Sequence, residues 1–538
     1  MSSSPQSPPS TNTSSEEAQV LLRREKAQAL RERGLAPFGN GLAVPDTTGD
    51  VRRAHGSQSP EELAAETRTY AIAGRVIELR RMGKLAFLRL YDRDGDLQVM
   101  VRKDAVGPAF DLIVESLLDR GDIVRAAGRP IRTKTGELSL EATELSVLTK
   151  ALRPLPEKWH GLADVELRYR RRYVDLFTTP GVRDVFLKRA RMIRAIRGFL
   201  DGRGYVEVET PTLHEQAGGA AARPFSTHHN ALDLDLNLRI ATELHLKRLV
   251  VGGLERVYEI GRIFRNEGID RRHNPEFTSI ELYQAHATYL DLMELTEALF
   301  KALALYVTDQ TTVTYQGTAI DFLPPYPRVS MVGAVGQHYA EALGFAPPAR
   351  DDASGWLDLL AAHRDEIHRD LLTQAGAKKE MGLTEAEAMN PRSLGELIAV
   401  AFELYGEPQL DPTRPTFVVD FPLEVSPLAR KRDADERLVD RFELYVAGME
   451  LANAFSELND PDDQRARFRA QVEAAKKGDE EAMPYDEDFI RALEHGMPPT
   501  AGEGIGIDRL CMVFTDAASI RDVILFPLLR PEEKTSGG

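Results

Sequence analysis

The sequence predicts an α+β protein with two parts: a small N-terminal β-barrel, and a larger domain in which helices flank an antiparallel sheet. Three observations predict this fold. Residues 70–148 show short strands with turn signals between them, which is typical of a small barrel. Residues 182–285 and 441–515 contain longer strands with helices between them. Residues 330–405 are helical and acidic, which predicts a helical insertion between two strands.

The chain has 538 residues, enough for about three or four domains. A start rich in Ser, Pro and Thr predicts disorder, and a charged amphipathic helix follows and ends at Gly34. This helix is either a solvated surface helix or a basic helix that contacts nucleic acid, and the two interpretations fit equally well. Its basic residues are Arg23, Arg24, Lys26, Arg31 and Arg33. The expected parts are a disordered tail at 1–15, a helical extension at 16–68, the barrel at 69–149, a linker at 150–180 and a second domain at 181–535.

Composition excludes several classes of protein. Hydrophobic residues make up 42% and charged residues 28%, as in ordinary globular domains. We expect no membrane association and no secretion, because no apolar run approaches the ~18 residues of a membrane helix and the start lacks a signal pattern. The single cysteine, Cys511, excludes an internal disulfide and a cysteine zinc cluster, and suits a reducing cytoplasm.

The net charge of −16 is unevenly distributed. Residues 301–440 carry −9 and residues 441–500 carry −7, whereas the first 300 residues are close to neutral. Electrostatic attraction of a partner depends on local patches rather than on the isoelectric point. The N-terminal part therefore remains open to a nucleic-acid partner.

One aromatic residue stands out in the barrel. Leu85, Phe87 and Leu90 predict a strand against an apolar core, and residues 97–102 alternate between apolar and polar in the strand after it. Small barrels of this kind often bind single-stranded nucleic acid by aromatic stacking. Phe87 is either such a platform or part of the core, and the core is the default for an aromatic residue in a strand.

The second domain shows a clear order of elements. Residues 182–204 have apolar side chains at three- and four-residue steps, which predicts a helix. Residues 232–240 alternate strictly, which predicts a half-buried antiparallel strand. A helix with Thr242 as N-cap follows, and then two strands around a polar loop. Residues 441–458 predict a hairpin that turns at Gly448.

The first group of candidate site residues surrounds the polar loop at 266–276. Arg265 precedes it, and a guanidinium binds two oxygens of a phosphate or carboxylate at once. One face of the return strand carries two aromatic rings, a hydroxyl and a carboxylate: Phe277, Ser279, Glu281 and Tyr283. The other face carries Ile280 and Leu282, which suit a core. The polar face therefore predicts a cleft in which Phe277 stacks on a base, and the alternative is a surface hairpin with incidental ion pairs.

The second group lies on the hairpin near residue 448. Glu443 and Glu450 are expected to face each other across the turn, where two carboxylates repel unless a cation lies between them. Oxygen ligands without Cys or His favour magnesium. Asn453, Phe455 and Glu457 follow on one strand face, and Glu457 is a spare negative charge suited to a cationic substrate group. The alternative is a solvated acidic edge strand.

The third group is Gly-Glu-Gly-Ile-Gly-Ile-Asp-Arg at 502–509. Its small residues let a ligand approach the backbone closely. Asp508 is expected to cap the helix that follows, and Arg509 to open it. The spacing matches neither the P-loop nor the dinucleotide fingerprint. A nucleotide site here would be of another type.

The three groups resemble motifs 2 and 3 of the class II aminoacyl-tRNA synthetases, and residues 182–211 resemble motif 1, the usual dimer interface. Four stretches resemble the lysyl-tRNA synthetase family: Phe-Arg-Asn-Glu-Gly at 264–268, His-Asn-Pro-Glu-Phe-Thr at 273–278, Glu-Val-Ser-Pro-Leu-Ala-Arg at 424–430 and Phe-Ser-Glu-Leu-Asn-Asp at 455–460. The resemblance runs from about residue 68 to 531. It is specific, because several independent stretches match in the same order.

The resemblance implies an OB-fold barrel that binds the anticodon and a class II domain that adenylates lysine with ATP and passes it to tRNA(Lys). The implied catalytic residues are Arg265, which holds the α-phosphate and the lysine carboxylate, and Arg509, which holds the γ-phosphate end. The implied ATP-binding residues are Arg265, Glu267, His273, Asn274, Phe277, Glu443, Glu450 and Arg509. Those implied for lysine are Gly219, Glu243, Arg265, Glu281, Tyr283, Asn453, Phe455 and Glu457, the last as partner of the ε-ammonium group. Glu443 and Glu450 are the implied ligands of magnesium, with up to three ions per site.

The resemblance also implies a cytoplasmic homodimer. In the barrel, it implies that Phe87, Gln98 and Glu137 contact the anticodon, where they fit a stacked and hydrogen-bonded uracil; the alternative is that Phe87 only fills the core. The chain departs from the family's usual pattern at His245, where relatives often carry tyrosine, in a longer segment at 330–405, and in the Ser- and Pro-rich start.

Four other activities fit these residues less well. A ligase for aspartate or asparagine shares the barrel, but Glu243, Glu281 and Glu457 would repel a substrate carboxylate. Relatives that add lysine to a protein lack the barrel, and lysyl transfer to lipid requires membrane helices. A non-catalytic tRNA-binding paralogue usually lacks an ATP-site arginine or a metal carboxylate, and this chain keeps them all.

Overall fold

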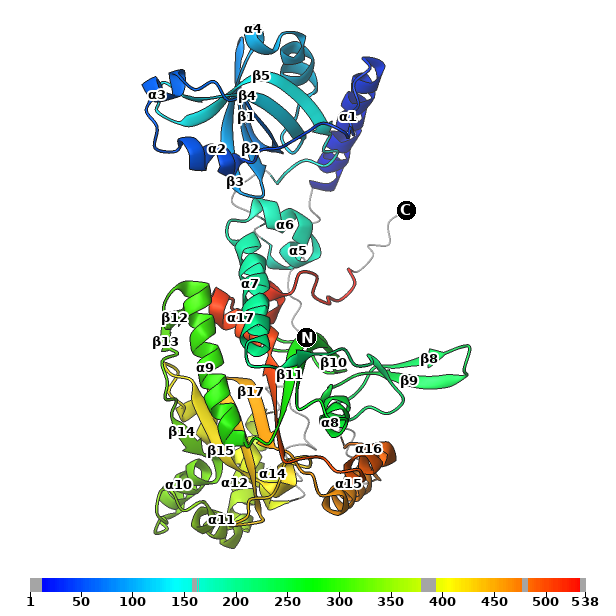
Figure 1. The fold of residues 1–538 in the computed structure, drawn as a ribbon, viewed down its shortest axis with the longest axis vertical. Coiled ribbons are helices and arrows are strands. Elements are labelled where there is room, and N and C mark those ends of the chain that lie inside the picture. The colour runs from blue at the N-terminus through cyan, green and yellow to red at the C-terminus, as the bar shows by residue number, and fades with distance from the viewer. Residues whose placement is uncertain (1–11, 157–161, 163, 379–392, 477–481, 533–538) are drawn as a thin grey trace, which may run out of the picture. The chain divides into compact units, whose positions relative to one another are not determined.

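The computed structural model describes residues 12–156, 162, 164–378, 393–476 and 482–532. The chain forms two compact units, Met1–Trp159 and His160–Gly538, each with its own hydrophobic core (Figure 1). Residues 1–11 of the expected disordered tail lie outside the described residues. Residues 12–15 belong to a helix, so the prediction of disorder is wrong for them.

The first unit contains the predicted barrel. Its five strands close in the order β1, β2, β3, β5, β4. Their bounds are β1 Tyr70–Met82, β2 Leu85–Asp92, β3 Gly95–Arg102, β4 Ile123–Arg132 and β5 Leu138–Thr149. Neighbouring strands are antiparallel except β3 and β5, which are parallel. Every second side chain points into the core, as the alternation from 97 to 102 predicts: Leu97, Val99 and Val101 are buried.

The face assignment of β2 corrects one prediction. Ala86, Leu88 and Leu90 fill the barrel, each with no exposed area. Leu85 and Phe87 lie one residue out of step with them and are half-buried on the outer face. The period of two in a strand leaves no other arrangement once Leu88 and Leu90 point inward. Phe87 is therefore not part of the barrel core.

The N-terminal extension packs on this barrel. It consists of α1 Asn12–Glu32, α2 Thr48–His55 and α3 Pro60–Ala64, and the helical turns α4 Lys103–Val106 and η1 Phe110–Leu117 follow β3. Lys26 of α1 donates to Asp119 at 2.6 Å, and the buried Lys150 donates to both Asp119 and Asp122. Arg23 donates to the carbonyl oxygen of Ala151 at 2.9 Å. Two of the basic side chains of α1 thus bind the chain itself.

The second unit is built on an eight-stranded sheet with the order β14, β15, β16, β17, β18, β11, β10, β6. The strands are β6 Val206–Glu207, β10 Arg256–Phe264, β11 Glu276–Ala285, β14 Arg328–Ser330, β15 Thr416–Pro422, β16 Leu438–Val446, β17 Met449–Ser456 and β18 Thr500–Gly506. The six central strands are antiparallel. At the two edges of the sheet, β14 is parallel to β15 and β6 is parallel to β10. The prediction of an α+β fold with a helix-flanked antiparallel sheet is confirmed.

Helices cover one face of this sheet and bury the main core. They are α7 Val182–Asp201, α9 Tyr289–Thr308, α17 Ile507–Thr515 and α18 Ile520–Val523. A second group of helices comprises α8 Glu243–Val251, α15 Pro461–Lys476 and α16 Glu487–Glu494, and encloses a smaller core. Figure 1 shows both groups, and the two-stranded sheet of β12 Thr312–Tyr315 and β13 Thr318–Asp321 beside α9.

Two predictions for this unit need correction. The expected strand at 232–240 is the shorter β9 Leu234–Leu238, which pairs with β7 Leu213–His214 and β8 Ser226–His229 in a small projecting sheet (Figure 1). Neither of its faces is buried, and Leu232 is 70% exposed. The expected linker contains two helices, α5 Val165–Arg170 and α6 Arg172–Thr178. Buried Arg172 of α6 pairs with Asp175 at 2.7 Å.

The insertion is helical, as predicted. It comprises α10 Met331–Leu343, α11 Ala353–Ala362, α12 Arg364–Lys378, α14 Leu394–Ala401 and η3 Phe402–Gly406, and the short turns η4 Glu407–Gln409 and η5 Leu423–Val425 lie on either side of β15. These helices share a separate core with β15 and β16. Residues 379–392 lie outside the described residues. Within the described ranges, no helix is long and apolar enough to cross a membrane.

Candidate active site

The central strands of the second unit expose one face to a cavity of about 470 Å³. The other face of the same strands belongs to the core, where Ile280, Leu282 and Ile505 have no exposed area. This volume is typical of small-molecule sites. Most of the predicted site residues line it: Gly219, Glu243, Arg265, Glu267, His273, Asn274, Phe277, Glu281, Tyr283, Glu450, Asn453, Phe455 and Arg509. The predicted division of β11 into a polar and a core face is confirmed.

One part of the cavity is basic and aromatic. Arg265 follows β10, Phe277 lies on β11, and the guanidinium carbon of Arg265 is 5.3 Å from the centre of the Phe277 ring. Arg509 of α17 is 2.9 Å from Nε2 of His273 and donates to the carbonyl oxygen of Glu450 at 2.8 Å. Two guanidinium groups and a half-buried ring in one cavity suit a phosphorylated aromatic ligand.

Asp508 does not cap α17, contrary to the prediction. The N-cap residue is Gly506. The Asp508 carboxylate accepts a hydrogen bond from the backbone N–H of Thr278 at 2.7 Å and pairs with Arg189 of α7. This buried contact joins α7, β11 and the start of α17, and thereby supports the position of Arg509.

Glu443 and Glu450 are not directly opposite each other. The two-residue turn at Ala447 and Gly448 places Glu450 opposite Tyr445, and a bulge between Leu444 and Tyr445 then places Glu443 opposite Asn453. Glu443 accepts a hydrogen bond from Arg441 at 2.7 Å and does not line the cavity. Burial, and then the charge of Glu443, raise the pKa of Glu450 to about 7.

These two carboxylates fit magnesium as part of a larger set of ligands. Among the described residues, no group of three or more His, Cys, Asp or Glu side chains lies close enough to hold a metal. Magnesium commonly takes one or two carboxylates and completes its shell with phosphate oxygens and water. The raised pKa of Glu450 marks a carboxylate that lacks sufficient positive charge nearby. Glu443 and Glu450 therefore suit a magnesium ion that also has phosphate oxygens as ligands.

Another part of the cavity is acidic. The backbone N–H of Thr242 donates to Glu281 at 3.0 Å, and burial raises the pKa of Glu281 to about 7. Glu243 begins α8 beside it. Gly219 has a positive φ of 89°, and a Cβ there would lie 3.1 Å from the Cβ of Glu243, so the backbone comes close to the start of this side chain. A carboxyl group with a raised pKa in a cleft, as at Glu281, suits a cationic ligand.

Glu457 corrects the prediction of a spare negative charge. It is 1% exposed, and its Oε2 forms an ion pair with the fully buried Nζ of Lys247. The same ammonium group donates to Glu243 at 2.6 Å. Oε1 of Glu457 has no hydrogen-bond partner among the described residues. It points to Gly502, where a Cβ would lie 2.2 Å away. Glu457 thus keeps one oxygen available while Lys247 neutralises its charge.

Sequence reasoning missed two residues of the site. Lys247 lies four residues after Glu243, and this helical spacing of opposite charges was a readable signal. Arg441 lines the cavity and donates to Asn453 at 3.1 Å and to Ser426 at 2.8 Å, as well as to Glu443. Its signal was weaker: it lies two residues before Glu443, on the same strand face.

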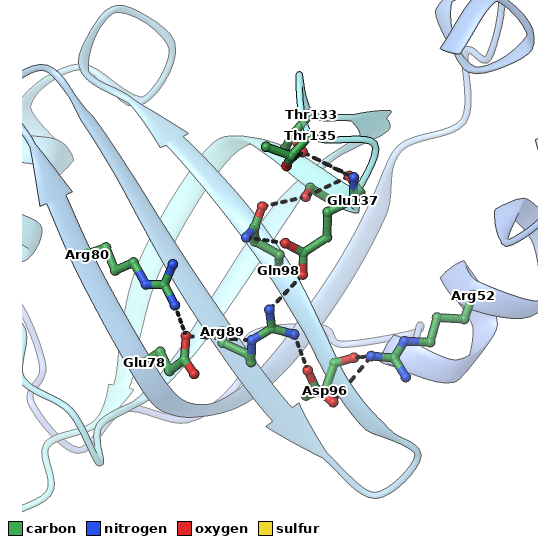
Figure 2. A network of polar contacts seen from close by, with 10 residues as sticks. Arg52, Glu78, Arg80, Arg89, Asp96, Gln98, Thr133, Thr135 and Glu137 are labelled. Carbon is green, nitrogen blue, oxygen red and sulfur yellow. Dashed lines mark hydrogen bonds and ion pairs between the residues drawn. The ribbon is translucent and has the colours of Figure 1, made fainter. Parts of the chain in front are cut away.

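The predicted anticodon residues lie together in the first unit. Phe87 is half-buried on the outer face of β2, beside Arg80 of β1 and Met100 of β3 in the strand register. Gln98 of β3 donates to Glu137 at 2.8 Å, and Arg89 of β2 donates to the same carboxylate at 2.6 Å (Figure 2). Glu137 is thus a hydrogen-bonded member of a network and not a free acceptor.

Two family models match the chain. The model of tRNA synthetases class II (D, K and N) matches residues 164–530, which contain the cavity. The model of the OB-fold nucleic acid binding domain matches residues 70–148, which form the barrel.

Several relatives match over nearly the full length. A protein named lysine–tRNA ligase from Anaeromyxobacter dehalogenans (strain 2CP-C) is 64% identical over 517 residues, which cover 96% of this chain and 98% of the relative. Proteins of the same name from Moorella thermoacetica and Enterococcus faecalis are 50% and 48% identical. They are covered over 98% and 97% of their lengths, and they cover 96% and 95% of this chain.

Proposed function

The chain belongs to the class II tRNA synthetases of the D, K and N group, and we propose from its site that it is a lysine–tRNA ligase. It joins lysine to tRNA in two steps and consumes ATP. The lysine carboxylate first displaces pyrophosphate from ATP and gives lysyl-adenylate. A hydroxyl of the terminal ribose of tRNA(Lys) then displaces AMP. The observation that carries lysine as the substrate is the acidic group of Glu243 and Glu281, which line the cavity, and Glu457, whose Oε1 points to Gly502 of the lining.

The basic part of the cavity supports the first step. In-line displacement at the α-phosphorus needs positioning and charge neutralisation, and no protein nucleophile. Arg265 would hold the α-phosphate and the lysine carboxylate together, and Arg509 the γ-phosphate end. Phe277 would stack on adenine, beside Glu267, His273 and Asn274. The two arginines are already restrained in the free enzyme by contacts to Ile240, Glu450 and His273.

Magnesium would be held by Glu443 and Glu450. When bound, it supplies positive charge to the phosphate oxygens. The chain's own part is to keep the two carboxylates in place: Arg441 and Tyr445 donate to Glu443 at 2.7 and 3.0 Å. The number of ions, up to three, is part of the proposal.

The acidic part of the cavity supports recognition of a dication. Glu243 and Glu457 pair with one internal ammonium group, Lys247, and Glu281 adds a third carboxyl group to the pocket. The acidic groups thus outnumber the buried cation. Glu243 and Gly219 would bind the α-ammonium group, and Glu457 with Tyr283 the ε-ammonium group. Asn453 and Phe455 complete the pocket. The D and N members of the family act on smaller, uncharged or acidic side chains, for which this excess of carboxylates is unsuitable.

Outside the cavity, the barrel would bind the anticodon through Phe87, Gln98 and Glu137. We also propose a homodimer. Most apolar side chains of α7 pack inside their own unit, so the buried face of this helix is not the surface that would pair. Exposed Leu187, Val206 and Leu213 remain available for a partner, at 46–49% exposure. The same proposal puts the enzyme in the cytoplasm, where its tRNA substrate is used.

Pyrophosphate exchange with a panel of amino acids tests the proposal. Exchange with lysine and ATP should exceed exchange with aspartate, asparagine, arginine and ornithine, and should not require tRNA. Charging of a tRNA(Lys) transcript should follow with lysine. Exchange driven by aspartate or asparagine, or an absence of exchange with lysine, would contradict it.

A further inference from the structure

A single arginine on the outer face of the barrel touches three carboxylates. Arg89 of β2 pairs with Asp96, with Glu137 at 2.6 Å and with Glu78 at 3.8 Å (Figure 2). Arg52 of α2 also pairs with Asp96 at 3.3 Å. The side chains are between one quarter and one half exposed, so each ion pair contributes little to folding stability. The main effect of the network is instead to hold its side chains in fixed positions.

The network ends on the amide group of Gln98. Arg89 occupies Oε1 of Glu137, and Nε2 of Gln98 donates to Oε2 of the same carboxylate at 2.8 Å. On its other side, Oε1 of Gln98 accepts from the hydroxyl of Ser139 at 2.9 Å. A carboxylate can only accept, so the nitrogen of the amide must face Glu137. One N–H and one oxygen lone pair of Gln98 remain for a ligand, in a fixed order.

The order of donor and acceptor on the Gln98 amide determines which of two pyrimidine bases it can match. Uracil presents an N–H at position 3 and an oxygen at position 4, whereas cytosine presents an unprotonated nitrogen and an amino group at the same places. A glutamine that is free to rotate its amide by 180° can match either base. A glutamine held in one orientation matches one of them and opposes the other with like groups.

We propose that Arg89 is a positioning residue for anticodon reading, which by holding Glu137 locks the amide of Gln98 and so favours uracil over cytosine. The inference rests on the proposed function of the barrel. Among the described residues, Arg89 is the only cation that pairs with Glu137. Glu137 itself precedes β5 in a loop, where its backbone N–H donates to Thr133. Without Arg89, the carboxylate is free to move and the amide is free to turn.

The test compares two tRNA(Lys) transcripts that carry uracil or cytosine at the centre of the anticodon. The kcat/KM of aminoacylation is measured for the full-length wild type, Arg89→Met, Arg89→Lys and Arg80→Met. Arg80 is a matched control, because it lies on β1 near the same network, pairs with Glu78 at 3.1 Å and is 71% exposed. Pyrophosphate exchange with lysine reports the other unit and should be equal in all four proteins.

In Arg89→Met the preference for uracil should fall about tenfold, the worth of one hydrogen bond, mainly through a lower rate with the uracil transcript. Arg89→Lys should restore part of the preference, and Arg80→Met should keep all of it. If Arg89→Met proves unfolded by thermal melting, Glu137→Gln tests the same contact, since an amide at 137 no longer dictates which end of Gln98 faces it. The same fall in preference is expected.

An equal loss with both transcripts, together with a weaker salt dependence, would overturn the inference and identify Arg89 as a phosphate contact. An unchanged preference in Arg89→Met would also overturn it. These outcomes leave the proposed function intact if the wild type charges the uracil transcript. A wild type that does not charge that transcript would instead refute the proposed function itself.

Discussion

At the scale of single residues, one lysine changes how the site works. Lys247 is fully buried between Glu243 and Glu457, and both carboxylates share its ammonium group. A buried carboxylate without a partner would stay protonated, because burial disfavours the charged form. Burial raises the pKa of Glu457 well above its usual value, and the ammonium group of Lys247 acts in the opposite direction. The charge of this carboxyl group therefore depends on a balance between burial and its ion pair with Lys247.

Glu457→Gln tests this balance. The change leaves Lys247 with one carboxylate partner and removes the proposed partner of the ε-ammonium group. Breaking one side of a buried ion pair costs about 3–5 kcal/mol, so the KM for lysine in pyrophosphate exchange should rise by about two to four orders of magnitude, with little change in the KM for ATP. Glu294→Gln, on the exposed side of α9, serves as the control. Unchanged lysine kinetics in Glu457→Gln would exclude this role.

Glu450→Gln tests the metal site. The neutral side chain relieves the repulsion from Glu443 but removes one of the two proposed oxygen ligands. Adenylation should slow, and half-maximal activity should need more magnesium. The measurement is a magnesium titration of pyrophosphate exchange at saturating ATP and lysine. The proposed ligand set is wrong if the titration midpoint matches that of the wild type.

At the scale of elements, β18 separates the cavity from the core. Gly502 and Gly504 line the cavity, whereas the side chain of Glu503 between them points to the core side and accepts a hydrogen bond from Thr296 of α9 at 2.6 Å. Oε2 of Glu503 has no hydrogen-bond partner among the described residues. The core face of the strand therefore holds a buried acid, whose pKa burial raises to about 8.

Glu503 should make the stability of the second unit depend on pH. Burial raises its pKa from 4.5 to about 8, so the folded state holds a proton that the unfolded chain has already lost. Its contribution to stability is complete below pH 4.5 and falls as the pH rises towards 8, by about 1.4 kcal/mol per pH unit. Glu503→Gln removes this titration. The midpoint of urea unfolding should therefore decline less between pH 5 and 8 in the variant. Parallel profiles would show that Glu503 is not protonated.

In the barrel, the prediction concerns Phe87 on the outer face of β2, which is the proposed stacking platform for a base. Phe87→Ala leaves no cavity in the core, because Phe87 lies outside it. Stacking of a base on an aromatic ring is worth about 1–3 kcal/mol, so charging of tRNA should fall between 5- and 150-fold, and lysine-dependent pyrophosphate exchange should persist. Leu88→Ala is the matched control in the core and should lower the melting temperature instead. Normal charging by Phe87→Ala would refute the contact.

At the scale of the whole molecule, the proposed roles are divided between the two units. The cavity belongs to the second unit and the proposed anticodon residues to the first. Variants of the first unit should therefore lower charging and spare lysine-dependent exchange, whereas variants of the cavity should lower both, because charging consumes the lysyl-adenylate. The anionic charge is concentrated after residue 300, away in sequence from the barrel that would bind RNA.

The homodimer is the prediction at this scale. Closed two-fold pairing is the commonest way to cover an apolar surface, and Leu187, Val206 and Leu213 are half exposed. Sedimentation velocity at micromolar concentration should give twice the chain mass of 59.9 kDa. Leu187→Glu should shift the protein towards monomer if this surface forms the contact, whereas Leu343→Glu, in the insertion, should not. A wild-type monomer at that concentration would exclude the dimer.

The sequence by itself determined the fold class, the barrel, the order of the helices and strands, and most of the residues that line the cavity. It could do so because periods of two and 3.6 residues record which face of an element is buried, and because the motifs that carry the site are contiguous in sequence. The polar face of β11 from Phe277 to Tyr283 is the clearest case: alternation with Ile280 and Leu282 already separates ligand face from core face.

The tertiary structure alone decided the contacts that join distant residues. The turn at Gly448 placed Glu450 opposite Tyr445 and not opposite Glu443, and Lys247 formed an ion pair with Glu457. Asp508 bonded to Thr278 and Arg189 instead of capping α17, and Arg89 paired with Glu137. The sequence records which side chains can ionise or donate, but the pairing of charges depends on a few ångströms of register and approach. Coulomb and hydrogen-bond energies vary steeply over that distance, whereas the burial of a face does not.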